Sequence, residues 1–290
     1  MVLDIRTHIR EFSRPFAERA GLKLFSGFAD VVVLAATFFT VVHLVVSPAL
    51  SRALFPTSYG RVNKKTRNSW SANAHVVSLV HAVIVVVLSS LCLHAKSLDE
   101  DRAFGSHEDA TFVTAVACGY FIWDAAEAVI HFTDVGFVLH GFACLTIYVL
   151  ATRPFVLYYS VRFLLWEVST IFLDIHWFLD KTGKTGSTVQ LINGFALLTT
   201  FFAVRLIWGG FMSYDFFVTM SEVYNELPLF YVVIYGGGNI VLQCLNWFWF
   251  NKMINALRKR FVVKPAKSKL NGQGPGNNDG KLEAHGHKDT

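Results

Sequence analysis

The sequence predicts an all-α polytopic membrane helix bundle, with about seven transmembrane helices, an amphipathic helix before them and a disordered tail after them. Three observations predict this fold class. Hydrophobic residues make up 53% of the 290 residues and charged residues only 16%. The mean hydropathy is +0.42, which is outside the usual balance of a soluble domain. Several apolar runs reach the roughly 20 residues that a helix needs to cross about 30 Å of hydrocarbon.

The first segment, residues 1–27, has the pattern of an amphipathic helix. Its apolar and basic residues recur at helical spacing on different sides, with Ile5, Ile9, Phe12 and Phe16 on one side and Arg6, Arg10 and Arg14 on the other. No apolar stretch followed by a small-residue cleavage site occurs there, so a cleaved signal peptide is not expected. We therefore expect this segment to lie on a membrane surface.

Seven apolar runs follow and predict the transmembrane helices. Their expected limits are 28–50, 74–96, 110–132, 135–152, 155–180, 188–213 and 229–251. The first helix and a basic loop occupy 28–63, and the main helical domain occupies 64–257. The basic segment 258–290 is rich in Gly, Asn and Lys, has little apolar surface to bury and is expected to be a disordered cytosolic tail.

The distribution of charge predicts the orientation, because cytoplasmic loops retain Lys and Arg. With seven spans, one side of the membrane collects most of the basic residues, namely Arg52, Arg61, Lys64, Lys65, Arg67, Lys181, Lys184, Lys252, Arg258, Lys259 and Arg260. The other side holds the N-terminus and the acidic loop "SLDEDRAFGSHEDA". The C-terminus is therefore expected in the cytosol, where anionic lipid headgroups, and not nucleic acid, are the partners of the positive charge.

Ionisable and polar side chains recur inside the apolar runs. Such residues cost at least ~2.5 kcal/mol each at the centre of a membrane helix, so they are functional candidates. They are His81 in the second span, Asp124, Glu127 and His131 in the third, His140 in the fourth, Glu167 and Asp174 in the fifth, and Asn193 and Arg205 in the sixth. Each also has a structural explanation, either at a span end in the headgroup region or in an interhelical hydrogen bond.

The third and fourth spans are joined by only two or three residues, so they are expected to be antiparallel neighbours. This places His140 at about the depth of Glu127. Most of the polar residues then fall at similar depths on five helices. The sequence therefore predicts a polar layer within the membrane. The four cysteines fall in apolar runs without disulfide or zinc spacing, so no metal or cofactor is expected.

Five blocks of this sequence resemble the TLC-domain family, which includes the translocating-chain-associating membrane protein, the ceramide synthases and a neuronal ceroid lipofuscinosis protein. The blocks are "RNSWSANAHVVSLVHAVIV", "GYFIWDAAE", "LLWEVSTIFLDIHWFLDKTG", "LINGFALLTTFFAVR" and "NWFWFNKMI". Residues 64–257 are thus identified as a TLC domain, similar to the uncharacterised TLC-domain transmembrane proteins more than to the ceramide synthases. The resemblance implies an endoplasmic-reticulum membrane protein of lipid synthesis, sensing or transport.

In the ceramide synthases a pair of adjacent histidines, with acidic residues from neighbouring spans, is taken to join an acyl-CoA to a sphingoid base. His140 matches the first histidine, but the second position is Gly141. Asp124 and Glu167 match the acidic partners. The resemblance therefore implies His140, Asp124 and Glu167 as catalytic candidates, although one histidine cannot supply two imidazoles.

Three functions remain open at this point. The first is a lipid-homeostasis protein whose polar cavity binds membrane lipids, with His81, Glu127, His131, Asp174, Asn193 and Arg205 as candidate lipid-binding residues. The second is an acyl-CoA-dependent N-acyltransferase that uses His140 as its base. The third is a proton-coupled carrier, since His and carboxylate chains serve as proton relays. A receptor-like bundle is disfavoured, because neither an Asp/Glu-Arg-Tyr nor an Asn-Pro-x-x-Tyr motif occurs. The sequence leaves open whether the protein is a homo-oligomer.

Overall fold

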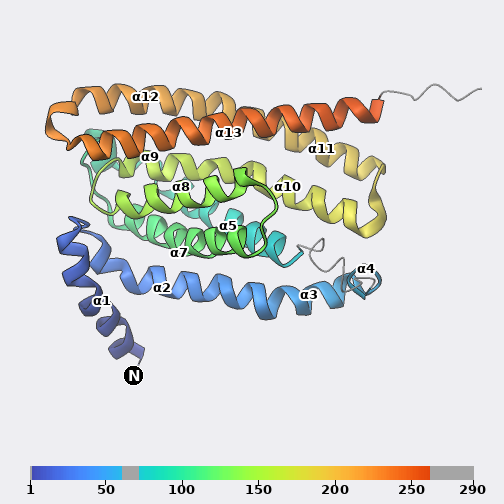
Figure 1. The fold of residues 1–290 in the computed structure, drawn as a ribbon, viewed down its shortest axis with the longest axis horizontal. Coiled ribbons are helices and arrows are strands. Elements are labelled where there is room, and N and C mark those ends of the chain that lie inside the picture. Colours follow the sequence, from blue (N-terminus) through green and yellow to red (C-terminus); the bar gives the residue numbers. More distant parts are fainter. Residues whose placement is uncertain (1, 61–71, 262–290) are drawn as a thin grey trace, which may run out of the picture.

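The apolar runs form helices in the computed structural model, which describes residues 2–60 and 72–261 (Figure 1). Every regular element of these two segments is a helix. Within them, five helical stretches are long and apolar enough to cross a membrane, which confirms a multi-pass helix bundle. They are Phe25–Leu54, Asn73–Leu91, Glu108–Ile130, Thr188–Glu222 and Leu229–Lys259.

Several of these stretches join shorter helical elements end to end. The first is α2 (Phe25–Val41), the π turn η1 (Val42–Val46) and α3 (Ser47–Leu54). The second and third are α5 (Ala72–Leu91) and α7 (Glu108–Ile130). The last two are α11 (Thr188–Phe201) with the π turn η5 (Phe202–Trp208) and α12 (Gly209–Glu222), and then α13 (Leu229–Phe261). Short elements fill the connections, namely α4 (Pro56–Gly60), α6 (Lys96–Glu100), η4 (Asp180–Lys184) and η6 (Tyr224–Glu226).

The two remaining expected spans are shorter or interrupted. The span expected at 135–152 is α8 (Val135–Ala151), whose 17 residues extend about 25 Å. The span expected at 155–180 consists of α9 (Leu157–Phe163), a 3₁₀ turn η3 (Leu164–Trp166) and α10 (Glu167–Leu179). Because the 3₁₀ turn breaks the α-helix in the middle, this segment is an interrupted helix and not one regular helix.

The ends of the expected domains are only partly described. α13 continues to Phe261, ten residues past the expected end of its span, so the first four residues of the expected tail are helical. The rest of that tail, 262–290, and the basic residues of 61–71 lie outside the described residues.

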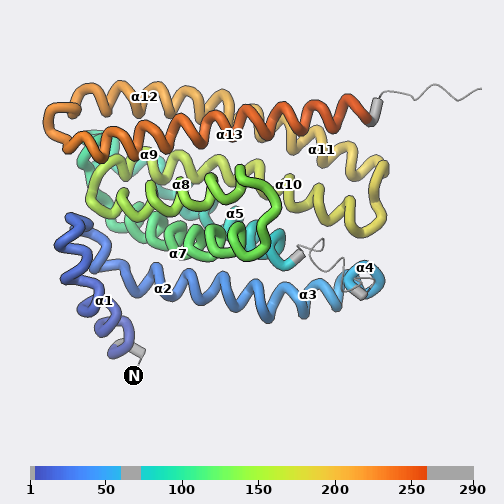
Figure 2. The backbone as a smooth tube through the Cα atoms, in the orientation of Figure 1, coloured from blue at the N-terminus to red at the C-terminus, as the bar shows by residue number. Residues whose placement is uncertain are grey.

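The helices run back and forth along the long axis of the molecule (Figure 2). Their connections therefore gather at two ends, which we name by their charge. The acidic end comprises residues 92–107, 152–156 and 223–228, and the basic end comprises residues 55–60, 131–134, 180–187 and 252–261. In Figure 1 the acidic end lies at the left and the basic end at the right.

The core is formed where α2 crosses α7 and the backbones of the two helices approach each other closely. A Cβ on Gly119 of α7 would lie 2.5 Å from Cβ of Ala35 and 2.7 Å from the carbonyl oxygen of Val32. Only glycine permits this approach, which is a common device in membrane helix packing. The pair α2 and α7 thereby forms a rigid base on which α8 packs.

The amphipathic helix α1 (Val2–Arg19) is present and presents its basic side to the bundle. The Nε atoms of Arg6 and Arg10 donate hydrogen bonds of 2.6 and 2.7 Å to the two carboxylate oxygens of Asp30, which is fully buried in α2. The hydrogen bond to Asp30 raises the pKa of Arg10 above its ordinary value. Phe12 and Phe16 point away from the bundle and are 70% and 61% exposed. The apolar side is thus free to face lipid.

Candidate functional site

A narrow cavity of about 50 Å³ lies inside the bundle, between α8, α9, α10, α12 and α13. On α8, His140, Cys144, Ile147 and Tyr148 line it at spacings of three and four, so one helical face follows the cavity for about 12 Å. The other walls are almost entirely apolar, formed by Phe121, Val156, Phe163, Leu164, Trp166, Phe216, Tyr235 and Leu242. Each water-sized group needs about 10–15 Å³ of cavity volume. A cavity of about 50 Å³ therefore holds only a few such groups and is slender.

Three polar side chains from three helices line this cavity at one depth. His140 lies eleven residues before the end of α8, Glu167 ten residues after the start of α9, and Asn239 ten residues after the start of α13. All three helix ends belong to the acidic end of the bundle. At 1.5 Å per residue, the three side chains lie roughly 15 Å below it. The cavity therefore has a polar girdle within apolar walls.

Glu167 is held from behind by Arg205, which the π turn η5 directs into the bundle. Arg205 is 6% exposed, and its Nη2 atom lies 3.6 Å from Oε1 of Glu167. The guanidinium donates four further hydrogen bonds of 2.9–3.3 Å, to the Trp166 carbonyl, Ser169 Oγ, Thr170 Oγ1 and Asn246 Oδ1. π turns such as η5 interrupt the regular α-helix and are frequent at functional sites. Arg205, a candidate lipid-binding residue by its sequence, is thus part of a buried polar cluster with Glu167.

His140 projects toward the cavity among aromatic rings. Its ring makes edge contacts with Phe121 and Trp249 at centroid distances of 6.3 and 5.6 Å. Its ring nitrogens lie 3.8 Å from the sulfur of Cys144. Among the described residues, no hydrogen bond joins His140 to Asp124 or Glu167. The residues predicted as catalytic are thus neighbours in space without forming a triad.

Gly141 explains why a second histidine has no place here. Its backbone faces α7, where a Cβ would lie 3.1 Å from Cα of Ala125 and 3.1 Å from Oδ2 of Asp124. Even a methyl group at position 141 requires α7 to give by a few tenths of an ångström, so a histidine there requires a larger separation of the two helices. The departure from the paired histidines is therefore built into the close packing of α7 against α8, and Asp124 lies at this helix contact and does not line the cavity.

The remaining members of the predicted polar layer are separate from the cavity. Asp174 is buried and accepts a 2.7 Å hydrogen bond from Nδ1 of His75, whose ring stacks on Trp177 at 4.3 Å. Glu127 and His131 form a 2.9 Å pair at the basic end of α7, where His131 is half exposed. These are two separate hydrogen-bonded pairs of a histidine and a carboxylate.

Two more predicted residues have packing contacts. His81 is fully buried and stacks on Tyr120 with a centroid distance of 3.5 Å and an interplanar angle of 4°. Asn193 donates a 2.9 Å hydrogen bond to the carbonyl of Phe172 and so ties α11 to α10. The residues of the predicted polar layer therefore lie in several separate places. Of them, only His140, Glu167 and Arg205 belong to one cluster at the cavity.

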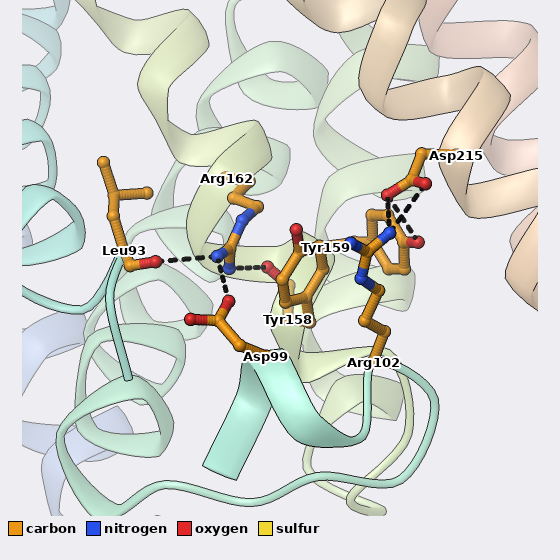
Figure 3. A network of polar contacts seen from close by, with 7 residues as sticks. All are labelled: Leu93, Asp99, Arg102, Tyr158, Tyr159, Arg162 and Asp215. Carbon is orange, nitrogen blue, oxygen red and sulfur yellow. Dashed lines mark hydrogen bonds and ion pairs between the residues drawn. The ribbon is translucent and has the colours of Figure 1, made fainter. Parts of the chain in front are cut away.

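The acidic end holds a second polar network, which the sequence did not reveal (Figure 3). Nη1 of Arg102 donates hydrogen bonds of 2.7 and 2.8 Å to both oxygens of Asp215, and the Tyr159 hydroxyl donates a 3.1 Å bond to the same carboxylate. Beside it, Arg162 donates 3.0 Å to Asp99. Burial disfavours the charged guanidinium of Arg102, but neighbouring tyrosine and carboxylate groups outweigh this and raise its pKa.

A polar pocket of about 380 Å³ opens at this network. Five carboxylates and Arg102 line it, the carboxylates being Asp99, Glu100, Asp101, Asp215 and Glu222. Tyr159 separates the pocket from the cavity, because its ring lines the cavity while its hydroxyl bonds to Asp215 and to Thr219, both of which line the pocket. Val156, just before α9, adopts a left-handed conformation with φ of 54°, which is strained for a β-branched residue.

Sequence reasoning missed Asn239, Tyr235 and Tyr159 as cavity residues. Asn239 was the one with a signal, since it is an amide inside the apolar run "VVIYGGGNIVLQCL". The tyrosines carry no comparable signal, because aromatic residues are common in membrane helices.

The helices and the intramembrane cavity define a polytopic membrane protein with a site enclosed by its bundle. The chain belongs to the TLC-domain family, whose domain model matches residues 71–255. It is 40% identical to an uncharacterised TLC domain-containing protein of Schizosaccharomyces pombe over 254 residues, which are 87% of this chain and 86% of that protein. It is 33% identical to the topoisomerase I damage affected protein 4 of Saccharomyces cerevisiae over 246 residues, with 81% and 85% coverage.

A vertebrate relative extends the comparison. The chain is 30% identical to TLC domain-containing protein 4-B of Danio rerio over 245 residues, which are 81% of this chain and 91% of that protein. The predicted resemblance to such TLC-domain proteins, in preference to ceramide synthases, is confirmed. No solved structure matches significantly.

Proposed function

We propose that this protein binds the acyl chain of a membrane lipid in its cavity and thereby acts in lipid homeostasis, through membrane lipid composition, lipid binding or trafficking. The observation that carries this proposal is the cavity itself, with apolar walls along α8 and a polar girdle at His140 and Glu167. Apolar pockets with a few convergent polar groups are the usual form of ligand sites.

The walls favour a methylene chain over a polar ligand. Each buried methylene contributes about 0.8 kcal/mol, and nearly all of the lining is hydrocarbon. The cavity is narrower than an extended chain requires, so binding needs rotation of wall side chains such as Phe163 and Leu164. The buried pair of Glu167 and Arg205 limits how deep the chain can reach toward α11.

The proposal includes a seven-pass arrangement in the endoplasmic reticulum with a cytosolic C-terminus. Besides the five long helices, α8 and the interrupted helix of α9, η3 and α10 run the length between the acidic and basic ends. Lys181, Lys184 and Lys252 lie at the basic end. Retention of basic residues on the cytosolic side supports this orientation, and α1 then lies along the opposite surface with Phe12 and Phe16 toward lipid.

The second candidate is an acyl-CoA-dependent N-acyltransferase with His140 as general base. It is favoured by the shared depth of His140 and Glu167 at one cavity, which suits a base beside a carboxylate. Two features disfavour it. Arg205 already engages Glu167, and Gly141 leaves no room for a paired imidazole.

The test of lipid binding uses two matched cysteine variants. Cys144→Phe fills the cavity, whereas Cys244→Phe places the same ring on an exposed position of α13. Purified protein is irradiated with a photoactivatable fatty acid and the labelled peptides are mapped. We expect labelling on α8 and α13 in wild type and Cys244→Phe, and loss of that labelling in Cys144→Phe.

Labelling confined to the outer surface of wild-type protein would contradict the proposal, and this outcome needs no variant to fold. Expressing the two variants in cells that lack the wild-type protein then connects binding to function, because only Cys144→Phe should alter the membrane lipid profile. For the enzymatic alternative, acyl-CoA and a long-chain amine are supplied to purified protein. Amide formation that His140→Ala abolishes would favour that alternative.

A further inference from the structure

Two polar side chains on α13 face the cavity without a hydrogen-bond partner. Tyr235 is 2% exposed, and its hydroxyl has no partner among the described residues. Asn239, one helical turn further, is 6% exposed, and no hydrogen bond of its side chain is found in the described part of the chain. Both side chains line the cavity together with Leu242, so this face of α13 forms its second long wall.

Unpartnered polar groups at this depth are costly. A buried donor or acceptor without a partner costs about 1–3 kcal/mol, and no bulk water is present in the membrane core to compensate. Two other polar side chains of α13 do have partners. Gln243 on the same helix donates a 3.0 Å bond to Ser213, and Asn246 accepts from Arg205. Tyr235 and Asn239, which face the cavity, have no such partner among the described residues, and Nε1 of Trp166, another cavity residue, is also unpartnered there.

We propose that Asn239 and Tyr235 form a polar anchor for the carbonyl group of an acyl ester or acyl amide whose chain occupies the cavity. This inference rests on the proposed function and adds a chemical class to the ligand. The Asn239 amide and the Tyr235 hydroxyl both donate hydrogen bonds, and a carbonyl oxygen has two lone pairs to accept them. An ether oxygen is a weaker acceptor than a carbonyl oxygen, and a plain hydrocarbon chain would leave both donors unsatisfied.

The position of the anchor agrees with this chemistry. Asn239 lies at the depth of Glu167 and His140, so the carbonyl is held at the polar girdle. The apolar side chains of Ile147 and Val156 toward the acidic end then contact methylene groups.

The experiment compares three photoactivatable probes that share one chain, namely an acyl ester of glycerol, the corresponding acyl amide, and an alkyl ether of glycerol without a carbonyl. Purified wild-type protein should be labelled on α8 and α13 more strongly by the carbonyl probes. One hydrogen bond corresponds to about a fivefold preference. Asn239→Leu and Tyr235→Phe should each reduce this preference about fivefold without reducing ether labelling.

Asn251→Leu is the matched control, because Asn251 lies on the same helix but is exposed and bonds to the Trp247 carbonyl. It should leave all three probes unchanged. Preference for the ester or the amide identifies which carbonyl compound is bound. Equal labelling by carbonyl and ether probes in wild type overturns the anchor while leaving chain binding intact. Absence of cavity labelling by all three overturns the proposed function and the anchor together.

A second measurement tests the anchor without a ligand. In delipidated protein, Asn239→Leu removes an unpartnered polar group, so its midpoint of thermal unfolding should equal or exceed that of wild type. A clear fall in the midpoint, relative to Asn251→Leu, would mean that Asn239 has a structural partner and is not an anchor.

Discussion

The ion pair inside the bundle and the ion pair at the acidic end differ in their surroundings more than in their chemistry. Arg205 and Glu167 have side chains that are 7% and 11% exposed, and their closest atoms lie 3.6 Å apart. Arg102 and Asp215 are 44% and 19% exposed, and their closest atoms are 2.7 Å apart. The pair with the shorter contact is therefore also the more exposed one.

This difference teaches that burial, and not distance, determines which pair the fold depends on. Exposed pairs contribute roughly 0.2–1 kcal/mol, because water solvates either partner when the other is removed. Removing one partner of a buried pair leaves an uncompensated charge and costs about 3–5 kcal/mol. We therefore expect substitutions in the buried pair at the cavity to destabilise the fold strongly, and substitutions in the exposed pair at the acidic end to be tolerated.

The largest effect is expected for Arg205→Met. This change removes the ion pair with Glu167 and four hydrogen bonds while keeping an apolar stem. We expect a loss of about 3–5 kcal/mol in the free energy of unfolding, measured by denaturant unfolding in lipid micelles. Adding Glu167→Gln to this variant should restore part of the loss, since the unpaired charge is then gone. Equal stability of wild type and the single variant would contradict the burial of this cluster.

Gly141→Ala tests how tightly the region around the cavity is packed. The new methyl group would meet the α7 backbone at Ala125 within 3.1 Å, so α7 and α8 must separate slightly. We expect a destabilisation of about 1–3 kcal/mol, as for other overpacked cores. Gly237→Ala on α13 is the matched control, because no atom lies within 4 Å of its added Cβ. The control should be neutral or stabilise by roughly 0.5–1 kcal/mol, since alanine is the better helix former. A reversed order of the two variants would argue against the close contact.

The sequence was sufficient to predict a multi-pass helix bundle, because five stretches in the described part of the chain are long and apolar enough to cross a membrane. It also identified Glu167, His140 and Arg205 as intramembrane polar residues, since such residues are expensive wherever they occur. The interruption between α9 and α10 was not predicted, because no Gly or Pro marks the 3₁₀ turn Leu164–Trp166 within the expected span 155–180.

Which polar residues meet could not be predicted, because that depends on helix rotation and on local breaks in helical period. The π turn at Phe202–Trp208 shifts the direction of Arg205 and brings it to Glu167. An ideal helical period contains no such shift. The placement of Asn239 beside the cavity likewise depends on how α13 packs against α8, which no pattern within α13 specifies.

A much smaller effect is expected at the acidic end. Arg102→Met breaks the pair with Asp215, but both positions reach water, so the free energy of unfolding should fall by only about 0.2–1 kcal/mol. The difference between wild type and variant should shrink further in 1 M salt, where the screening length is about 3 Å. Measurement at low and high salt checks both statements. A salt-independent loss as large as that of Arg205→Met would remove the distinction between the two regions.

The smallest effect concerns the turn between α7 and α8 at the basic end. Asp134 accepts a 2.7 Å hydrogen bond from the backbone N–H of Gly136 and a 3.2 Å bond from Lys252 of α13. The backbone bond first, and then Lys252, lower the pKa of Asp134 below its usual 3.8.

Because the folded pKa is lowered, this carboxylate stabilises the fold above the unfolded-state pKa and ceases to do so as the pH falls through the lower folded value. Asp134→Asn keeps a capping side chain but removes the charge. Between about pH 5 and pH 3, unfolding midpoints of wild type should therefore fall slightly more steeply than those of Asp134→Asn, and the two should converge in acid. Lys252→Met should reduce this difference only in part, since the Gly136 bond remains. Parallel pH profiles for wild type and Asp134→Asn would show that the turn is too exposed for its charge to matter.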